Sequence, residues 1–372
     1  MKIVFTGGHF SPAYSVIQEL DKKAEIVVLG RKNALEGDKS LSFEYKVCQD
    51  LKIPFYEVRA GRLSRKLTKF GLYSFLKLPL GFYDALRILR KTKPDIVLAF
   101  GGYISFPVTI AANILGIPVV LHEQTQGAGF ANKSIARFAT RVCVSFESSI
   151  PYFPKNKVIL TGNPVRREIF EEGKPVFDLG HGEKFIYITG GSTGSHFINI
   201  LTKDVIEELL SEFIVVHQTG NANNSGDFKL LTEEKEKLPH NLAKRYIVRE
   251  FIMPDEIGWI LKNASLVVSR AGINSVCEYI ALNCRALLIP LPHGQKGEQL
   301  ENARLLKNSG YGDYILQSEV TAEKFLEKIS ILASENIKSE DISKTKQLSR
   351  DAAKKIKNVL QLVYEKKQEK KV

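Results

Sequence analysis

The stretch IVLAFGGYISFPVTIAANILGIPVVL, from Ile96 to Leu121, decides how the fold of this chain is interpreted. It carries no charged residue and is longer than the roughly 20 residues that a membrane-spanning helix needs. Glycine and proline nevertheless divide it, at Gly101, Gly102, Pro107, Gly116 and Pro118. This punctuation favours a strand, a turn, a helix and a second strand over one continuous helix. We therefore interpret the stretch as the buried centre of a parallel sheet.

Short β-branched runs recur on both sides of this stretch and alternate with amphipathic segments. The predicted strands of the first half are KIVFT, AEIVVLG, DIVLAFG, IPVVLHE, RVCVSF and KVILTG. Those of the second half are KFIYITGG, FIVVHQTG, RYIVREF, ASLVVSR and RALLIPL. Such alternation predicts βαβ units in a doubly wound parallel sheet, and the series occurs twice. A chain of 372 residues is also long for a single core, so we expect two α/β domains.

The motif GNPVR, from Gly162 to Arg166, marks the border between the two series. We predict an N-terminal domain over residues 1–162 and a second domain over residues 163–345. A C-terminal helix over residues 346–372 is expected to pack back on the N-terminal domain and to end in a frayed, Lys-rich turn. Parallel sheets bind ligands beyond the carboxyl ends of their strands. We therefore expect a cleft between two facing domains, with the functional residues in its loops.

Composition narrows the class of partner. The chain has 53 Lys and Arg against 41 Asp and Glu, a net charge of +12, which favours nucleic acid, an anionic membrane surface or a phosphorylated substrate. Its four cysteines form no C-x-x-C pair, so neither a zinc site nor a redox dithiol is indicated. Met1 leads directly into a predicted strand, which leaves no room for a signal peptide. These features fit a reducing cytoplasm.

Two glycine-rich turns each follow a predicted strand and precede a predicted helix. In GGSTGS, Gly190 to Ser195, glycines allow a ligand to approach the backbone and the next helix favours negative charge, which suits a diphosphate. The spacing is neither that of a P-loop nor G-x-G-x-x-G. In TGGH, Thr6 to His9, the histidine suits a general base or an anion contact, and a capping or loop histidine is the structural alternative.

A carboxylate follows the strand LVVS and the turn RAG in the motif SRAGINSVCE. We expect this residue, Glu278, near the start of a helix. There it either offsets the positive end of the helix dipole or binds a ligand. The residues alone leave both interpretations open.

Eight motifs occur in the order and rough spacing of the MurG-type glycosyltransferases: GGYISFP, GIPVVLHEQ, ANKSIARFA, GNPVR, GGSTGS, HQTG, SRAGINSVCE and EQLENA. From Met1 to about Gly312 the chain resembles these enzymes. The resemblance implies the GT-B fold, in which two Rossmann-like parallel-sheet domains face each other across a cleft. It also implies an inverting transfer of N-acetylglucosamine from UDP-N-acetylglucosamine to the muramoyl 4-hydroxyl of lipid I, which forms lipid II in peptidoglycan synthesis.

The resemblance implies a role for each matching residue of the donor site. Glu278 binds the ribose hydroxyls, and Ile252 lies in the segment whose backbone reads the uracil. The diphosphate contacts are implied at Gly191 and Ser192, with Arg166 neutralising charge. Gln299 is implied to bind the sugar hydroxyls.

On the acceptor side the resemblance implies contacts at Gly8, Tyr103, His122 and Thr125. A base must accept the proton of the attacking hydroxyl, and we predict His9 in this role, with Glu123 as the other candidate. The chain departs from the family pattern in these loops and at one position beside the donor sugar. Thr125 stands where the family has asparagine, the opening turn TGGH is shortened, and Glu298 replaces a Gln or His beside the sugar residue.

Residues 62–90, RLSRKLTKFGLYSFLKLPLGFYDALRILR, interleave basic and aromatic side chains. This density suits a surface that enters an anionic leaflet, and an amphipathic core helix with a solvated basic face is the alternative. We expect a peripheral enzyme on the cytoplasmic face of the membrane, with no nucleic-acid partner. The cleft motifs contain no D-x-D pair, so no obligatory metal or other cofactor is expected.

Three other functions stay open at this point. A different lipid glycosyltransferase of similar fold, for example one that acts on diacylglycerol, would differ in its acceptor. A UDP-sugar 2-epimerase shares the two-domain fold and needs no lipid. A non-catalytic protein that binds a nucleotide sugar or nucleic acid is suggested only by the charge.

Overall fold

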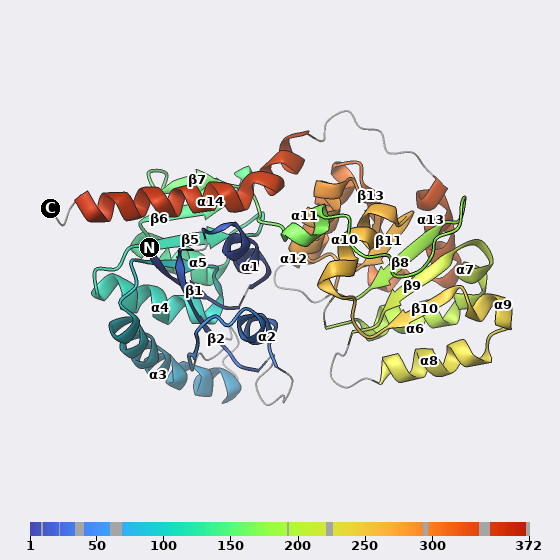
Figure 1. Cartoon of the computed structure of the whole chain (residues 1–372), viewed down its shortest axis with the longest axis horizontal. Coiled ribbons are helices and arrows are strands. Elements are labelled where there is room, and N and C mark those ends of the chain that lie inside the picture. Colours follow the sequence, from blue (N-terminus) through green and yellow to red (C-terminus); the bar gives the residue numbers. More distant parts are fainter. Residues whose placement is uncertain are drawn as a thin grey trace. The chain divides into compact units, whose positions relative to one another are not determined.

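The computed structural model describes residues 1–372 except 9, 22, 34–40, 60–68, 192, 221–225, 293–296, 335–342 and 370–372, and no side-chain surroundings for residues 43, 69–78 and 343–348. The chain forms two compact units (Figure 1). Met1–Arg166 and Leu348–Val372 make up the N-terminal unit, and Arg167–Gln347 the C-terminal unit. The sequence places the corresponding borders after residues 162 and 345.

The N-terminal unit is built on a parallel sheet of seven described strands, in the order β3-β2-β1-β4-β5-β6-β7. The strands are β1 (Lys2–Thr6), β2 (Glu25–Gly30), β3 (Phe55–Glu57), β4 (Ile96–Ala99), β5 (Val119–Glu123), β6 (Arg141–Val144) and β7 (Val158–Leu160). The direction of winding reverses between β1 and β4. That switch point is where open parallel sheets bind ligands.

Helices cover both faces of this sheet. They are α1 (Phe10–Glu19), α2 (Phe43–Asp50), α3 (Lys69–Thr92), α4 (Gly102–Ile114), α5 (Phe130–Ile135) and α14 (Ser343–Glu369), with 3-10 turns η1 (Ala136–Phe138) and η2 (Glu147–Tyr152). Because side chains alternate along a strand, Val4 packs with α3 and α4 on one face, and Ile3 and Phe5 pack with α1 on the other. Helix α14 lies across that second face, where Ile356 and Leu360 are fully buried (Figure 1).

The uncharged stretch from Ile96 to Leu121 is confirmed as the centre of the sheet. It forms β4, α4 and part of β5, and β4 is hydrogen-bonded between β1 and β5. All four residues of β4 are fully buried. Among the described residues, no helix combines the length and apolar composition that crossing a membrane requires.

The C-terminal unit repeats the architecture with six described parallel strands, in the order β10-β9-β8-β11-β12-β13. The strands are β8 (Phe185–Thr189), β9 (Ile214–Gln218), β10 (Tyr246–Arg249), β11 (Leu266–Ser269), β12 (Ala286–Leu288) and β13 (Gly312–Tyr314). The helices are α6 (His196–Asp204), α7 (Ile206–Glu212), α8 (Asp227–Lys237), α9 (His240–Ala243), α10 (Pro254–Asn263), α11 (Ile273–Leu282), α12 (Glu298–Asn308) and α13 (Ala322–Ser334), with 3-10 turns η3 (Arg167–Phe170) and η6 (Gln317–Glu319). Ile186 and Ile188 of β8 pack in one core with α7 and α13.

The expected α/β class with two parallel sheets is confirmed, and each predicted strand is present. Two strands were not predicted, β3 and β13. Both are three residues long and lie at a sheet edge, and none of their residues is fully buried. A short strand with one free edge needs no continuous apolar run, so it leaves little signal in the sequence.

Candidate functional site

The predicted donor residues of the C-terminal unit lie in the segments that follow β8, β10, β11 and β12, at the carboxyl edge of the sheet. In the first of these, Gly194 has φ +79°, and a Cβ there would lie 2.1 Å from the carbonyl oxygen of Thr219. The turn is therefore packed backbone against backbone onto the HQTG segment. Gly191 has φ +83° and nothing within 4 Å of its Cβ position, so this side is open to a ligand. Its N–H donates to Thr189 Oγ1 at 2.9 Å, and the neighbouring Ser192 lies outside the described residues.

A partly buried cation lies at the start of α6, directly after this turn. Ser195 caps the helix by accepting from Ile198 N at 3.4 Å. Arg270 Nε donates to Ser195 Oγ at 3.0 Å, and its Nη1 donates to the Ile289 carbonyl at 3.0 Å. Burial lowers the pKa of Arg270 to about 10, so the guanidinium remains charged at neutral pH. The guanidinium and the helix N-terminus together create a positive potential that favours an anionic ligand.

Sequence reasoning missed Arg270 as a site residue. It lies inside the quoted motif SRAGINSVCE, but its sequence position gives no sign of its hydrogen bond to Ser195, 75 residues away. The available signal was a lone arginine in a strand-to-helix turn. That signal alone does not distinguish a ligand contact from a surface charge.

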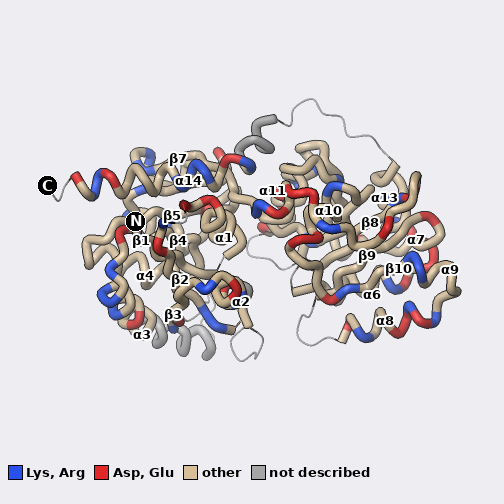
Figure 2. Tube along the Cα trace, viewed as in Figure 1, with Lys and Arg blue, Asp and Glu red and all other residues tan. Residues whose placement is uncertain are grey.

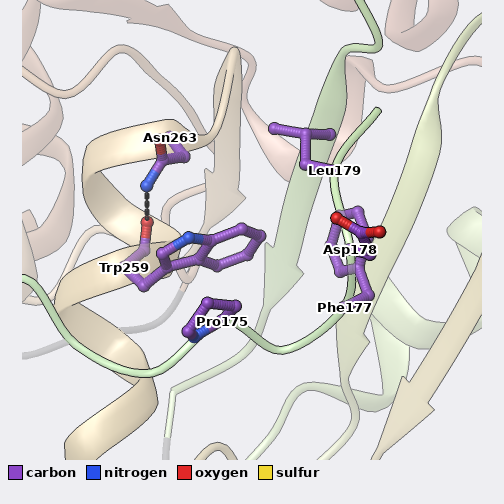
Figure 3. A pocket seen from close by; sticks show the side chains of 6 residues that line it. All are labelled: Pro175, Phe177, Asp178, Leu179, Trp259 and Asn263. Carbon is purple, nitrogen blue, oxygen red and sulfur yellow. Dashed lines mark hydrogen bonds between the residues drawn. The ribbon is translucent and has the colours of Figure 1, made fainter. Parts of the chain in front are cut away.

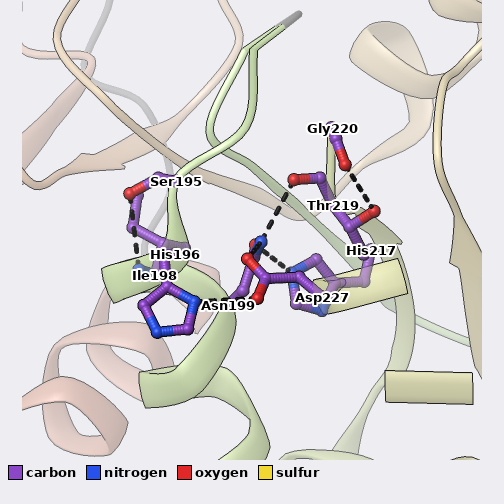
Figure 4. Close-up of polar contacts among 8 residues, drawn as sticks. All are labelled: Ser195, His196, Ile198, Asn199, His217, Thr219, Gly220 and Asp227. Atoms are coloured by element: carbon purple, nitrogen blue, oxygen red, sulfur yellow. Dashed lines mark hydrogen bonds and ion pairs between the residues drawn. The ribbon is translucent and has the colours of Figure 1, made fainter. Parts of the chain in front are cut away.

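The histidine of HQTG belongs to a buried polar network (Figure 4). Asn199 Nδ2 donates to the Thr219 carbonyl at 3.1 Å and to Asp227 Oδ2 at 2.7 Å, so its Oδ1 accepts from His217 Nε2 at 3.1 Å. The other ring nitrogen, Nδ1, then accepts from the Tyr246 hydroxyl at 2.9 Å. Burial lowers the pKa of His217 to about 3, which keeps the imidazole neutral.

This network extends to the surface of the unit. Asp227 begins α8 and is 3% exposed, and its Oδ1 accepts from His196 Nδ1 at 2.8 Å. His196 is the first residue of α6, and its side chain is 64% exposed. The network therefore connects the helix after the glycine turn to α8 and to β9. It holds the start of α6, directly after the glycine turn, in place. We assign none of its groups a role in catalysis.

Glu278 is placed differently from the sequence expectation. Helix α11 begins at Ile273, so Glu278 is its sixth residue and lies in the second turn rather than near the start. The residue is 5% exposed. The dipole effect falls off within the first turn, so it does not account for this carboxylate. A buried carboxylate needs specific partners, and the implied contact with ribose hydroxyls stays a prediction.

Helix α12 is fixed to two turns of the same edge. Gln299 Oε1 accepts from Leu291 N at 3.0 Å, and Asn302 Nδ2 donates to the Ala271 carbonyl at 3.0 Å. Asn302 is 1% exposed and was not among the predicted site residues, although EQLENA contains it. These bonds place the start of α12 beside the RAG turn. Gln299 therefore lies at the carboxyl edge of the sheet, and its contact with the sugar stays a prediction.

In the N-terminal unit, Gly8 lies in the turn after β1, and Tyr103 is the second residue of α4, which follows β4 across the switch point. A Cβ on Gly8 would lie 3.7 Å from the Gly101 carbonyl, so the turns after β1 and β4 meet there. Thr6 Oγ1 lies 2.7 Å from Ser105 Oγ and accepts from Phe100 N at 3.1 Å, which ties both turns together. His9, one of the two predicted bases, lies outside the described residues.

Glu123, the other predicted base, holds its own loop. Its Oε1 accepts from Thr125 N at 2.9 Å and from Thr125 Oγ1 at 2.7 Å. Its Oε2 accepts from Gly129 N and from Asn132 Nδ2, both at 2.9 Å. Both oxygens are engaged and the residue is 2% exposed, so this geometry favours positioning of the loop over proton transfer.

Two predicted residues of the N-terminal unit remain, His122 for the acceptor and Arg166 for the donor. Only 1% of His122 is exposed, and its Nε2 lies 3.3 Å from both the Gly162 carbonyl and Ser145 Oγ. Direct contact with an acceptor would therefore require this end of β5 to rearrange. Arg166 is half-buried at the end of the N-terminal unit, and its contact with the diphosphate stays a prediction.

The described residues include no group of three or more His, Cys, Asp or Glu side chains that could hold a metal ion. A pocket of about 610 Å³ lies against α10, between Trp259 and Asn263 of that helix and residues 175–179 (Figure 3). Trp259 stacks on Phe185, the first residue of β8, so this pocket lies toward the amino end of the strand. The predicted donor residues follow the opposite end.

Both halves of the chain match models of the same protein family. Residues 4–144 match the glycosyltransferase family 28 N-terminal domain, and residues 185–360 match the family 28 C-terminal domain. A curated "UDP-N-acetylglucosamine--N-acetylmuramyl-(pentapeptide) pyrophosphoryl-undecaprenol N-acetylglucosamine transferase" of Clostridium perfringens (strain SM101) is 34% identical over 341 residues, 89% of this chain and 90% of that protein. The protein of the same name from Clostridium botulinum (strain Alaska E43) is 32% identical over 344 residues, 90% of each chain.

Solved structures share the fold. The crystal structure of Acinetobacter baumannii MurG has a TM-score of 0.68 and 25% identity, and covers 97% of this chain and 99% of that chain. A UDP-GlcNAc 2-epimerase from Neisseria meningitidis has a TM-score of 0.62 at 16% identity, with 97% and 99% covered. The second likeness shows the fold alone.

Proposed function

The chain belongs to glycosyltransferase family 28, and from that premise we propose that it transfers N-acetylglucosamine from UDP-N-acetylglucosamine to lipid I. The observation that carries this function is the 34% identity, over 89% of the chain, to a relative named for that transfer. The acceptor in that name, N-acetylmuramyl-(pentapeptide) pyrophosphoryl-undecaprenol, is lipid I. The chain is thus a hexosyltransferase whose product is lipid II, a precursor of peptidoglycan.

The C-terminal unit binds the donor in this proposal. Arg270 and the N-terminus of α6 stabilise the negative charge that develops on the departing UDP, as fixed cations and helix dipoles do in other transferases. Glu278 accepts hydrogen bonds from the ribose, and Gln299 binds the sugar from the start of α12. The open side of Gly191 admits the diphosphate. No metal is required as a ligand of the nucleotide.

The reaction is a single displacement with inversion. The 4-hydroxyl of the muramoyl sugar attacks the anomeric carbon, and the bond from that carbon to the UDP oxygen breaks. UDP leaves with the bonding electrons, and the hydroxyl proton passes to a base. We assign the base to His9, because both oxygens of Glu123 already accept hydrogen bonds within their loop.

The acceptor binds at the carboxyl edge of the N-terminal sheet. Gly8 and Tyr103 flank the switch point between β1 and β4, where parallel sheets hold their ligands. The loop from Thr125 to Gly129, which Glu123 holds, forms the neighbouring wall. This assignment rests on the resemblance and on the adjacency of the turns.

Peripheral membrane contact is supported by part of the segment 62–90. On α3 an exposed stripe follows the helical period, with Leu80 43% and Tyr83 60% exposed, and Arg87, Arg90 and Lys91 exposed beyond them. Figure 2 shows Lys and Arg at the C-terminal end of α3. The opposite stripe, with Ala85, Ile88 and Leu89, is core. Residues 60–68 lie outside the described residues. The proposed location is the cytoplasmic face of the membrane, on anionic lipid.

The test measures UDP release from UDP-N-acetylglucosamine with and without a short-chain lipid I analogue, together with the labelled disaccharide product. We expect release that depends on the acceptor. Glu278→Gln should lower kcat/KM about tenfold, since a neutral amide accepts more weakly from two hydroxyls. Glu301→Gln, which changes an exposed carboxylate on α12 that pairs with Arg304, is the matched control and should leave the rate unchanged.

Other outcomes would assign the chain differently. Conversion of the sugar without any acceptor would overturn the transferase assignment in favour of a 2-epimerase. Transfer to diacylglycerol but not to the lipid I analogue would keep the donor site and change the acceptor. Equal activity of the Glu278→Gln variant and the wild type would remove that residue from the donor site.

A further inference from the structure

The glutamine of HQTG has no role in the function proposed above. Gln218 is the last residue of β9, which lies between β8 and β10, and it is 8% exposed. Its side chain therefore lies between the glycine turn that follows β8 and the segment that follows β10. On the proposed function, the first of these holds the diphosphate and the second reads the base.

One amide group connects these two segments. Gln218 Nε2 donates to the Gly191 carbonyl at 3.0 Å. Its Oε1 accepts from Ile252 N at 3.2 Å and from the Tyr187 hydroxyl at 2.9 Å. A carbonyl only accepts and a backbone N–H only donates, so the orientation of the amide is determined by its two backbone partners.

These bonds restrict the backbone of both segments. At Gly191 the N–H is held by Thr189 and the carbonyl by Gln218, so both peptide planes of this glycine are fixed. At Ile252 the N–H is held by Gln218, and the next N–H, of Met253, donates to Glu256 Oε2 at 2.9 Å. Because a trans peptide is planar, fixing an N–H also fixes the opposite carbonyl of the same unit.

We propose that Gln218 is a positioning residue that couples the diphosphate turn to the base-reading segment in one preorganised donor site. This proposal rests on the proposed function. A ligand that spans both segments gains from having them ordered together before it binds, whereas a ligand that occupies one segment gains less. The residue therefore increases selectivity for a nucleoside diphosphate over the free nucleoside.

The experiment titrates the full chain with UDP and with uridine by calorimetry. Gln218→Met keeps the length of the side chain and removes all three hydrogen bonds. It should lower the affinity for UDP about tenfold, the equivalent of one to two buried hydrogen bonds. The affinity for uridine should fall no more than about threefold. Tyr187→Phe removes the single bond that leads to neither segment and is the matched control. It should leave the ratio of UDP to uridine affinity unchanged.

Hydrogen exchange provides a second measurement that needs no ligand. In Gln218→Met, peptides covering residues 189–194 and 250–253 should both exchange faster than in the wild type. In Gln218→Glu the carboxylate still accepts from Ile252 N but cannot donate to Gly191, so only the first peptide should change. This arm remains informative if the methionine variant does not fold.

The outcomes separate the two proposals. Equal weakening of UDP and uridine, or exchange that rises in only one segment of Gln218→Met, would overturn the coupling role while leaving the transferase in place. Failure of the wild-type chain to bind UDP would instead remove the donor assignment, and the coupling with it. A normal kcat at saturating donor in Gln218→Met, with a raised KM, would support positioning over chemistry.

Discussion

The loop around Glu123 and the donor turns of the C-terminal unit are held together in opposite ways. The partners of Glu123 lie 2, 6 and 9 residues away, so one carboxylate closes one loop. The partners of Gln218 lie 27, 31 and 34 residues away, and Arg270 reaches Ser195 across 75 residues. The proposed acceptor loop is therefore a local structure, and the proposed donor site is assembled from distant parts of the chain. A substitution at Glu123 should therefore disturb only its own loop, whereas a substitution at Gln218 or Arg270 should disturb several segments.

The largest effect that separates the two regions is expected for Glu123→Ala. It removes the charged acceptor of the half-buried Thr125 N–H, the Gly129 N–H and the buried Asn132 side-chain amide, and a hydrogen bond to a charged group contributes about 1.5–3 kcal/mol. We expect the free energy of unfolding of the N-terminal unit to fall by about 4 kcal/mol. Urea denaturation followed by hydrogen exchange in each unit measures this loss.

Because this loop is local, Glu123→Ala should leave UDP affinity unchanged. Glu123→Gln, which keeps the shape and can still accept, is the control and should lose less stability. A fall in UDP affinity comparable to the fall in acceptor affinity would break the comparison, since it would mean that the loop is not independent of the donor site.

A smaller effect is expected for Arg270→Met. Removing the cation beside the α6 N-terminus should lower the transfer rate about a hundredfold, the size seen when one fixed electrostatic contact to a developing charge is lost. Arg270→Lys keeps the charge but cannot bond Ser195 and the Ile289 carbonyl together, so it should recover only part of the rate. Single-turnover kinetics with saturating donor measures the step. Full activity of the lysine variant would show that charge alone matters and that the long-range bonds do not.

The smallest effect concerns mild acid, where the first pH unit below 6.5 removes only about 1.4 kcal/mol of stability. The folded pKa of His217, about 3, lies below the ordinary value of about 6.5, so the unfolded chain binds the extra proton between these values. Stability from this residue is full above pH 6.5 and is lost as the pH falls toward 3, by about 1.4 kcal/mol for each pH unit. Acid denaturation should therefore begin in the C-terminal unit, and His217→Gln should flatten this dependence. Identical acid profiles for the variant and the wild type would exclude this explanation.

Much of the fold was accessible from the sequence because its signals are local. The buried stretch from Ile96 to Leu121 and the eleven β-branched runs predicted both sheets. The edge strands β3 and β13 were not predicted, because they are short and incompletely buried. Glu278 was placed one turn too early in its helix, since the turn before α11 carries no capping side chain that marks the boundary.

Composition and pattern by themselves determined the class of fold, the strand-turn-helix units and the glycine turns, because each depends on residues within about ten positions of one another. The tertiary structure alone decided which turns lie side by side. In a doubly wound sheet the strand order brings β8 between β9 and β11, so segments far apart in the chain meet at the carboxyl edge. Gln218, Arg270 and Asn302 acquire their partners only there.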